Sequence, residues 1–123
     1  MKQLLITIAA VLLVGCGPSE ADRALFKASQ RGNIKTVKQH LAAGADVNAK
    51  IGRGNMTPLH AAIQHGDKEI VELLIAKGAD VNAGGILGYT PLDTAVGERE
   101  KEIADLLRKH GGKTGEELKA EGK

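Results

Sequence analysis

Aromatic residues are almost missing from this sequence, since one Phe, one Tyr and no Trp amount to 2% of it. A core must therefore be built from Leu, Ile, Val and Ala, which favours small helices packed closely together. The shortage also removes the aromatic platform on which nucleic-acid bases stack. Lys and Arg number 17 against 15 Asp and Glu, and they are scattered along the chain. Without a concentrated basic footprint, no nucleic-acid partner is expected.

Cysteine is nearly absent as well, because Cys16 is the only one. A single thiol excludes an internal disulfide and any multi-cysteine metal site. The sequence also lacks HExxH, a Gly-rich phosphate loop and a nucleophile elbow. At 123 residues the chain has room for one domain. We expect neither a cofactor nor a metal ion.

The first sixteen residues have the layout of a secretory signal. Lys2 precedes an apolar stretch from 4 to 14, which is followed directly by Gly15 and Cys16. The stretch is shorter than the roughly 20 apolar residues that span a bilayer. With small Gly15 before the cysteine, it resembles the lipobox of bacterial lipoproteins, in which the cysteine is acylated and the signal is cut off. The residues alone leave open a buried N-terminal helix with an inert thiol.

The lipobox resemblance implies that residues 1–15 are a cleaved signal and residues 16–20 a lipidated tether. Gly17 stands where some lipoproteins carry an Asp retention signal, so the resemblance favours the outer membrane of a bacterial cell envelope. Five residue steps from Cys16 to Ala21 reach at most roughly 17 Å. Each buried methylene of an acyl chain adds about 0.8 kcal/mol of membrane affinity. The folded part is therefore expected to lie against the bilayer surface.

An internal repeat occupies most of the remaining chain. Gly-Ala-Asp-Val-Asn-Ala occurs at 44–49 and again at 78–83, and Thr-Pro-Leu occurs at 57–59 and again at 90–92. Repeats of this length with turn signals at fixed places are typical of a solenoid of stacked units. Each Thr-Pro predicts a helix start, because Thr caps a helix and Pro needs no N–H bond in its first turn.

These residues resemble the ankyrin repeat, whose pattern includes Thr-Pro-Leu-His-x-Ala-Ala, a turn glycine, a Glu-Ile-Val-x-Leu-Leu second helix and Gly-Ala-Asp-Val-Asn. The resemblance covers about residues 21–112. It implies an all-α repeat fold, an α-solenoid of about three helix–turn–helix repeats with β-hairpin-like loops. The implied repeats span about residues 21–53, 54–86 and 87–112.

The outer units depart from the ankyrin pattern. Phe26 replaces the motif's His in the first unit, and Asp93 replaces it in the third. Arg99 stands where the third unit would have its turn glycine, which leaves the shape of that turn open. The polar tail, 113–123, either forms one helical turn after Thr114 or is a frayed terminus.

His60 and Asp93 are the candidates for acid–base chemistry, because they occupy equivalent places one repeat apart. A small hydrolase built on this pair is one hypothesis. The ankyrin resemblance instead implies that the motif's His is a structural hydrogen-bonding residue. Asp46 and Asp80 are interpreted as turn residues that bond their own backbone. We expect no enzymatic activity.

The resemblance places a partner-binding surface on the hairpin tips and on the exposed side of the first helices. Exposed apolar residues rimmed by polar ones are typical of such surfaces. The predicted partner-binding residues are Arg53, Asn55, Met56, Gln64, His65, Ile86, Leu87, Tyr89 and Glu98. For Ile51 and Ile86, inward packing between the hairpins is the alternative.

The sequence thus predicts a membrane-anchored protein interaction module, an adaptor or scaffold that works as a monomer. Its anchor would be Cys16, and its partner a protein of unknown identity. An immunity or inhibitor protein that blocks an envelope enzyme or toxin fits the same features, and the sequence does not separate the two.

Overall fold

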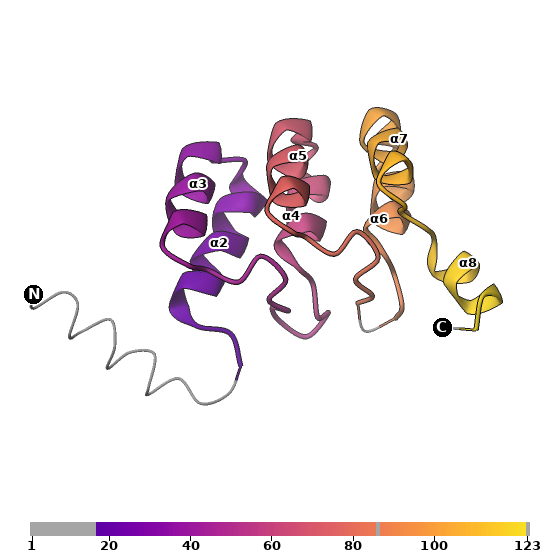
Figure 1. Cartoon of the computed structure of the whole chain (residues 1–123), viewed down its shortest axis with the longest axis horizontal. Coiled ribbons are helices and arrows are strands. Elements are labelled where there is room, and N and C mark those ends of the chain that lie inside the picture. Colours follow the sequence, from indigo (N-terminus) through magenta and orange to yellow (C-terminus); the bar gives the residue numbers. More distant parts are fainter. Residues whose placement is uncertain (1–16, 86, 123) are drawn as a thin grey trace, which may run out of the picture.

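The computed structural model describes residues 17–85 and 87–122. The predicted signal, with Cys16, lies outside the described residues, as do Ile86 and Lys123. The described part contains seven helices and no strand, which confirms the all-α solenoid. Six of the helices form three pairs that stand in a row (Figure 1). The pairs are α2 (Glu20–Arg31) with α3 (Ile34–Ala42), α4 (Pro58–His65) with α5 (Lys68–Ala76), and α6 (Pro91–Gly97) with α7 (Lys101–Lys109).

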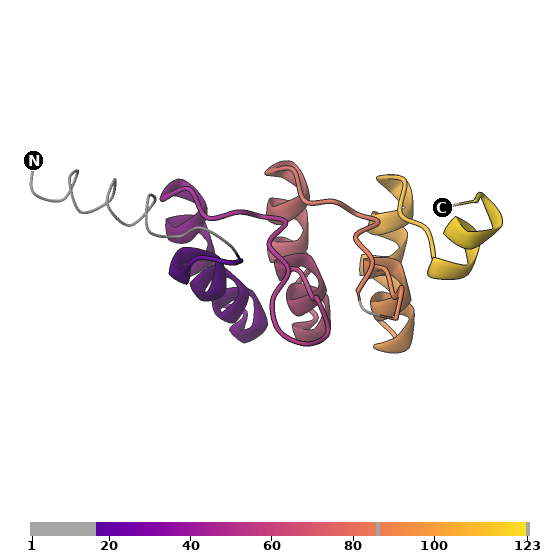
Figure 2. The same ribbon diagram turned by 90° about the horizontal axis from the view of Figure 1, so that it is seen from below.

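Seen from below, the three pairs form successive layers, and long loops connect one layer to the next (Figure 2). The first helices α2, α4 and α6 pack on one another more closely than do the second helices α3, α5 and α7. No helix in residues 17–85 or 87–122 has the length and apolar character needed to cross a membrane.

The first helix of the second and third units begins at the predicted Thr-Pro. The Thr57 side chain accepts from the backbone N–H of His60, and Thr90 does the same for Asp93. The side chains of His60 and Asp93 in turn accept from the backbone N–H of their capping Thr, which completes a capping box. These bonds join residues three apart, so the local sequence suffices to set both helix starts.

The turn between the two helices of a unit has the same shape in all three units. Gly32 and Gly66 adopt left-handed conformations with φ of 73° and 82°. Arg99 occupies the equivalent place in the third unit and has a φ of 60°. The missing glycine therefore leaves the turn unchanged, and a non-glycine residue takes the left-handed conformation instead.

The core runs the length of the row. Leu25, Leu59 and Leu92 occupy equivalent places in the three first helices, and all three are fully buried. Ile70 and Ile103 occupy equivalent places in the second helices of the last two units, and both are buried. Because each unit covers its neighbour's apolar face, no unit has a core of its own.

A ladder of Asn side chains joins the units along the loop side. Asn48 accepts from Asp80 N at 2.7 Å and donates to Gly78 O at 3.1 Å. Asn82 repeats the pattern with Lys113 N and Gly111 O, again at 2.7 and 3.1 Å. The ladder therefore continues beyond Gly111, where the repeat sequence stops.

Asp46 and Asp80 have the predicted role in the turns of this loop side. Each accepts from the backbone N–H two residues further on, at 2.9 Å.

The C-terminal tail forms a short helix, α8 (Gly115–Ala120), which decides between the two alternatives left by the sequence. Thr114 and Glu117 form its capping box. Two bonds dock the start of the tail on α6, since Thr90 Oγ1 donates to Lys113 O at 2.6 Å and Gly115 N donates to Asp93 Oδ2 at 2.9 Å. The tail thus caps the loop end of the third unit.

Candidate functional site

Two hairpin loops project from the row of helices on the side where the first helices begin (Figure 1). In the first, Ile51 and Met56 exchange backbone hydrogen bonds of 2.8 and 3.1 Å. In the second, the N–H of Gly85 donates to the carbonyl of Tyr89 at 3.0 Å. Four residues separate the paired positions in the first hairpin and three in the second. The unequal loop lengths in the sequence therefore produce two different hairpins.

The two hairpins lie directly against one another. A Cβ added at Gly85 would sit 2.9 Å from the carbonyl oxygen of Gly54. Met56 is half-buried, and its sulfur would lie 4.0 Å from that Cβ. Ile51 is half-buried as well. Met56 thus lies at the junction between the hairpins and is less exposed than its prediction as a partner-binding residue implied.

The exposed large apolar side chains of the described residues gather in the third unit. Leu87 is 76% exposed and Tyr89 is 60% exposed, both on the second hairpin. Val96, on α6, is 58% exposed. Leu87 and Tyr89 lie two residues apart on one hairpin, and clustered exposed apolar side chains are typical of binding surfaces, so these two are the candidates for contact with a partner.

A hollow of about 400 Å³ lies between the second hairpin and α8. Leu87 and Tyr89 line it from one side, and Leu118 of α8 lines it from the other. Its charged lining residues are Asp93, Glu116 and Lys119. We call this the C-terminal hollow. Its lining combines apolar and charged side chains, as protein-binding sites do.

Leu118 was missed by the sequence analysis, although one signal pointed to it. It is the only large apolar side chain in the tail after Gly112, and it follows the capping box of Thr114 and Glu117. A lone apolar residue on a short capped helix is expected to pack against a neighbouring surface.

Val96 was missed because its exposure depends on its place in the stack. Ile63, its equivalent in the second unit, is fully buried where α6 packs on α4. No fourth first helix among the described residues covers Val96, since α8 docks near the opposite end of α6, on Thr90 and Asp93.

The predicted partner-binding residues fall into two groups. Leu87 and Tyr89 lie at the C-terminal hollow, while Arg53 and Asn55 are exposed on the tip of the first hairpin. Half-buried Met56 belongs to this hairpin group, whereas Gln64, His65 and Glu98 form the second group and are exposed near the far ends of the first helices. An eight-residue helix such as α4 is about 12 Å long, so the structure does not bring the two groups together.

His65 also has a structural contact, with the turn of the first unit. A Cβ added at Gly32 would lie 2.2 Å from His65 Nε2, so the imidazole ring rests on this glycine. The contact joins the first and second units.

His60 is fully buried beneath the second hairpin. Its Nδ1 accepts from Thr57 N at 3.1 Å, and its Nε2 lies 3.2 Å from the carbonyl oxygen of Tyr89. These partners require a proton on Nε2 and none on Nδ1, which is the neutral ring. Burial lowers the pKa of His60, the bond to Tyr89 opposes this, and the positive charge of Lys50 lowers the pKa further.

His60 and Asp93 do not act on one another. Asp93 Oδ2 accepts from Thr90 N and from Gly115 N, both at 2.9 Å. Each side chain is thus committed to a helix cap and to the segment that follows in the stack, which is the second hairpin for His60 and the C-terminal tail for Asp93. This is the structural role implied for His60. Among the described residues no cluster of three or more His, Cys, Asp or Glu side chains could hold a metal ion.

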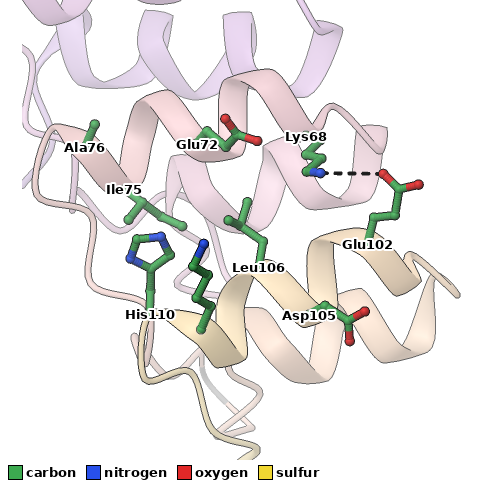
Figure 3. Close-up of a pocket in the computed structure, with 9 residues that line it drawn as sticks. Lys68, Glu72, Ile75, Ala76, Glu102, Asp105, Leu106 and His110 are labelled. Carbon is green, nitrogen blue, oxygen red and sulfur yellow. Dashed lines mark ion pairs between the residues drawn. The ribbon is translucent and has the colours of Figure 1, made fainter.

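A larger groove of about 740 Å³ lies between α5 and α7 (Figure 3). Ile75 and Leu106 provide its apolar surface, and Lys68 pairs with Glu102 across it at 3.6 Å. Its rim carries charges of both signs and contains none of the predicted partner-binding residues. The C-terminal hollow is therefore the better candidate, because exposed aromatic and aliphatic side chains meet there.

Comparison with known proteins agrees with the geometry. A family model described as "Ankyrin repeats (3 copies)" matches residues 7–85 and 25–117. The chain is also similar to the 2-5A-dependent ribonuclease of Mus musculus, with 47% identity over 47 residues. This match covers 38% of the chain but 6% of the mouse protein. With so little of that protein covered, its activity does not carry over.

Proposed function

Because this chain belongs to the ankyrin repeat family, whose stacked units form protein-binding surfaces, we propose that its partner docks at the C-terminal hollow. The exposure of Leu87 and Tyr89 around one hollow is the observation that carries the proposal. The module works as a monomer and performs no chemistry of its own.

The hollow suits a partner that inserts an apolar side chain. Tyr89 offers a large, stiff contact area, and its hydroxyl keeps a polar contact available at the rim. Leu118 closes the opposite wall. Asp93 and Glu116 contribute negative charge, so a partner with a basic residue beside its apolar anchor is favoured over an acidic one.

The docking proposal is tested by crosslinking the protein in its own membrane and identifying what is captured. We expect Leu87→Ala with Tyr89→Ala to weaken capture strongly, since anchor residues at interfaces often cost about 30-fold or more in affinity when truncated. Val96→Ala is the matched control, because it removes an exposed apolar side chain outside the hollow. Capture that survives the double substitution, or that is lost equally in the control, would exclude the hollow as the docking site.

The lipobox-like sequence supports a further part of the proposal, that Cys16 is acylated and holds the module at the bacterial envelope, on the outer membrane. We expect Cys16→Ala to abolish acyl labelling and to release the protein from the membrane fraction. Unchanged fractionation and labelling would contradict the anchor while leaving the docking proposal intact.

A further inference from the structure

A second hollow, of about 580 Å³, lies between α2 and the first hairpin. Helix α2 stands at the end of the row opposite α8 (Figure 1). All of its charged lining residues are basic, namely Arg23, Lys27 and Lys50. Its large apolar lining residues are Phe26 and Ile51. We call it the basic hollow. Its charge is the opposite of that at the rim of the C-terminal hollow, where two carboxylates face one ammonium group.

The positive charge extends along α2. Arg23, Lys27 and Arg31 follow one another at intervals of four, so they share one face of the helix. All three are exposed, and none forms an ion pair with another described residue. Their charges are therefore not neutralised within the described part of the chain.

The charge of the whole first unit follows the same trend. Residues 17–53, which comprise the first unit and the described residues before it, contain seven Lys and Arg against three Asp and Glu, whereas residues 54–123 contain nine against twelve. The near-neutral chain is thus divided into a basic first unit and an acidic remainder.

Pro18 also lines the basic hollow. It lies two residues after Cys16, so at most about 7 Å of chain separates this hollow from the proposed acylation site. On an acylated protein, the basic hollow cannot move far from the lipid headgroups.

We propose that the basic hollow, together with the α2 face that carries Arg23, Lys27 and Arg31, binds the phosphate headgroups of anionic phospholipids, so that the first unit lies on the membrane. The orientation rests on the proposed acylation of Cys16. Two signals, a lipid anchor and a basic surface, hold a protein more firmly than one. An acidic protein segment is a less suitable occupant, because it would have to enter between the first unit and the bilayer. Lipid contact here keeps the C-terminal hollow, at the other end of the row, free for the partner.

The test uses the full chain with Cys16→Ala, which cannot be acylated, and vesicles of phosphatidylcholine alone or mixed with phosphatidylglycerol. The apolar residues 4–14 contribute equally to both kinds of vesicle, so the preference for phosphatidylglycerol isolates the basic surface. We expect this preference to weaken as salt is added. Arg23→Gln with Lys27→Gln should lower affinity for the anionic vesicles about 20- to 30-fold.

The matched control is Lys77→Gln with Lys101→Gln, which removes the same charge from the second and third units and should change affinity less than about threefold. Lys50→Gln, on the hairpin, should lower affinity about fivefold and serves if the double variant of α2 does not fold. Equal binding to the two kinds of vesicle overturns the proposal, as does an equal loss in the control. Tight binding of a polyglutamate peptide without any vesicle preference would assign the hollow to a protein instead. Acyl labelling of the unsubstituted chain decides the anchor separately.

Discussion

At the scale of single residues, His60 and Asp93 show how one position changes its chemistry with its neighbour. The unit that follows His60 presents a carbonyl, that of Tyr89, and a protonated ring nitrogen can donate to it. The segment that follows Asp93 presents the N–H of Gly115, and a carboxylate can only accept. The replacement of His by Asp therefore matches the exchange of a hydrogen-bond acceptor, the carbonyl of Tyr89, for a donor, the N–H of Gly115. Both residues join neighbouring segments of the stack, and these hydrogen bonds account for them without an acid–base role.

The lowered pKa of His60 makes stability depend on pH. In the unfolded chain His60 has the ordinary histidine pKa of about 6.5, and in the folded protein it resists protonation. The unfolded state therefore binds more protons once the pH falls below about 6.5. The free energy of unfolding should therefore be constant above this pH with respect to His60, and should then fall by at most about 1.4 kcal/mol per pH unit.

Urea unfolding followed by circular dichroism between about pH 7.5 and about pH 5 measures this dependence. His60→Gln is the control, because it keeps a neutral hydrogen-bonding side chain and leaves the carboxylates and the other histidines unchanged. The variant should be less stable near neutral pH and should lose less stability on acidification. Equal slopes in the two proteins would contradict the role of His60.

At the scale of elements, the turns between paired helices are built to one shape from different residues. The backbone N–H of Asp67 donates to Ala62 O, and the N–H of Glu100 donates to Ala95 O, so the second and third units close their first helices by the same bond. Gly66 adopts the left-handed conformation without strain, whereas in Arg99 the Cβ crowds the backbone in this conformation. The third turn is held in place by its neighbours at some cost.

Arg99→Gly should relieve this cost and raise the free energy of unfolding by roughly 0.5–1 kcal/mol, because the relief outweighs the added flexibility of the unfolded chain. Glu98→Gly is the control in the same turn. Glu98 has a φ of −85°, where glycine brings only its entropic penalty, so this change should destabilise. Thermal or urea unfolding of the two variants measures these changes in stability. A loss of stability in Arg99→Gly would mean that contacts of the arginine side chain outweigh its backbone strain.

At the scale of the whole molecule, the row of units has two unlike ends. The first unit is basic and lies next to the proposed tether, and the last unit bears the exposed Leu87 and Tyr89. Stacks of this kind need terminal segments that shield the apolar face of the last unit. The tail is bonded to the loop end of the third unit through Lys113 and Gly115, at the start of α8, and it leaves Val96 open. The same segment supplies Leu118 to the C-terminal hollow, so capping and partner binding depend on one element.

Ending the chain after Gly112 should therefore affect both properties. It removes the bonds that Asn82, Thr90 and Asp93 make with the tail, and at about 1 kcal/mol for each hydrogen bond the loss should be about 3 kcal/mol. Partner capture should fail even under conditions in which the shortened protein is folded.

A chain ended after Ala120 is the control for this truncation. It keeps all three bonds and loses the exposed ion pair between Lys113 and Glu121, which contributes at most about 1 kcal/mol. Urea unfolding and crosslinking should therefore place this control near the full chain. Equal stability of the two shortened chains would show that α8 does not cap the stack.

The sequence by itself determined the stacked units, their helix starts and their turns. Those features depend on contacts between residues a few positions apart, such as Thr57 with His60, and on a repeat that recurs visibly. It also indicated that the second hairpin carries exposed apolar residues. Only the tertiary structure decided that Leu118 completes the hollow, that Val96 is uncovered and that Lys50 joins the basic surface of α2. These outcomes depend on which unit has a neighbour and on where distant segments meet, and no local pattern of residues encodes either.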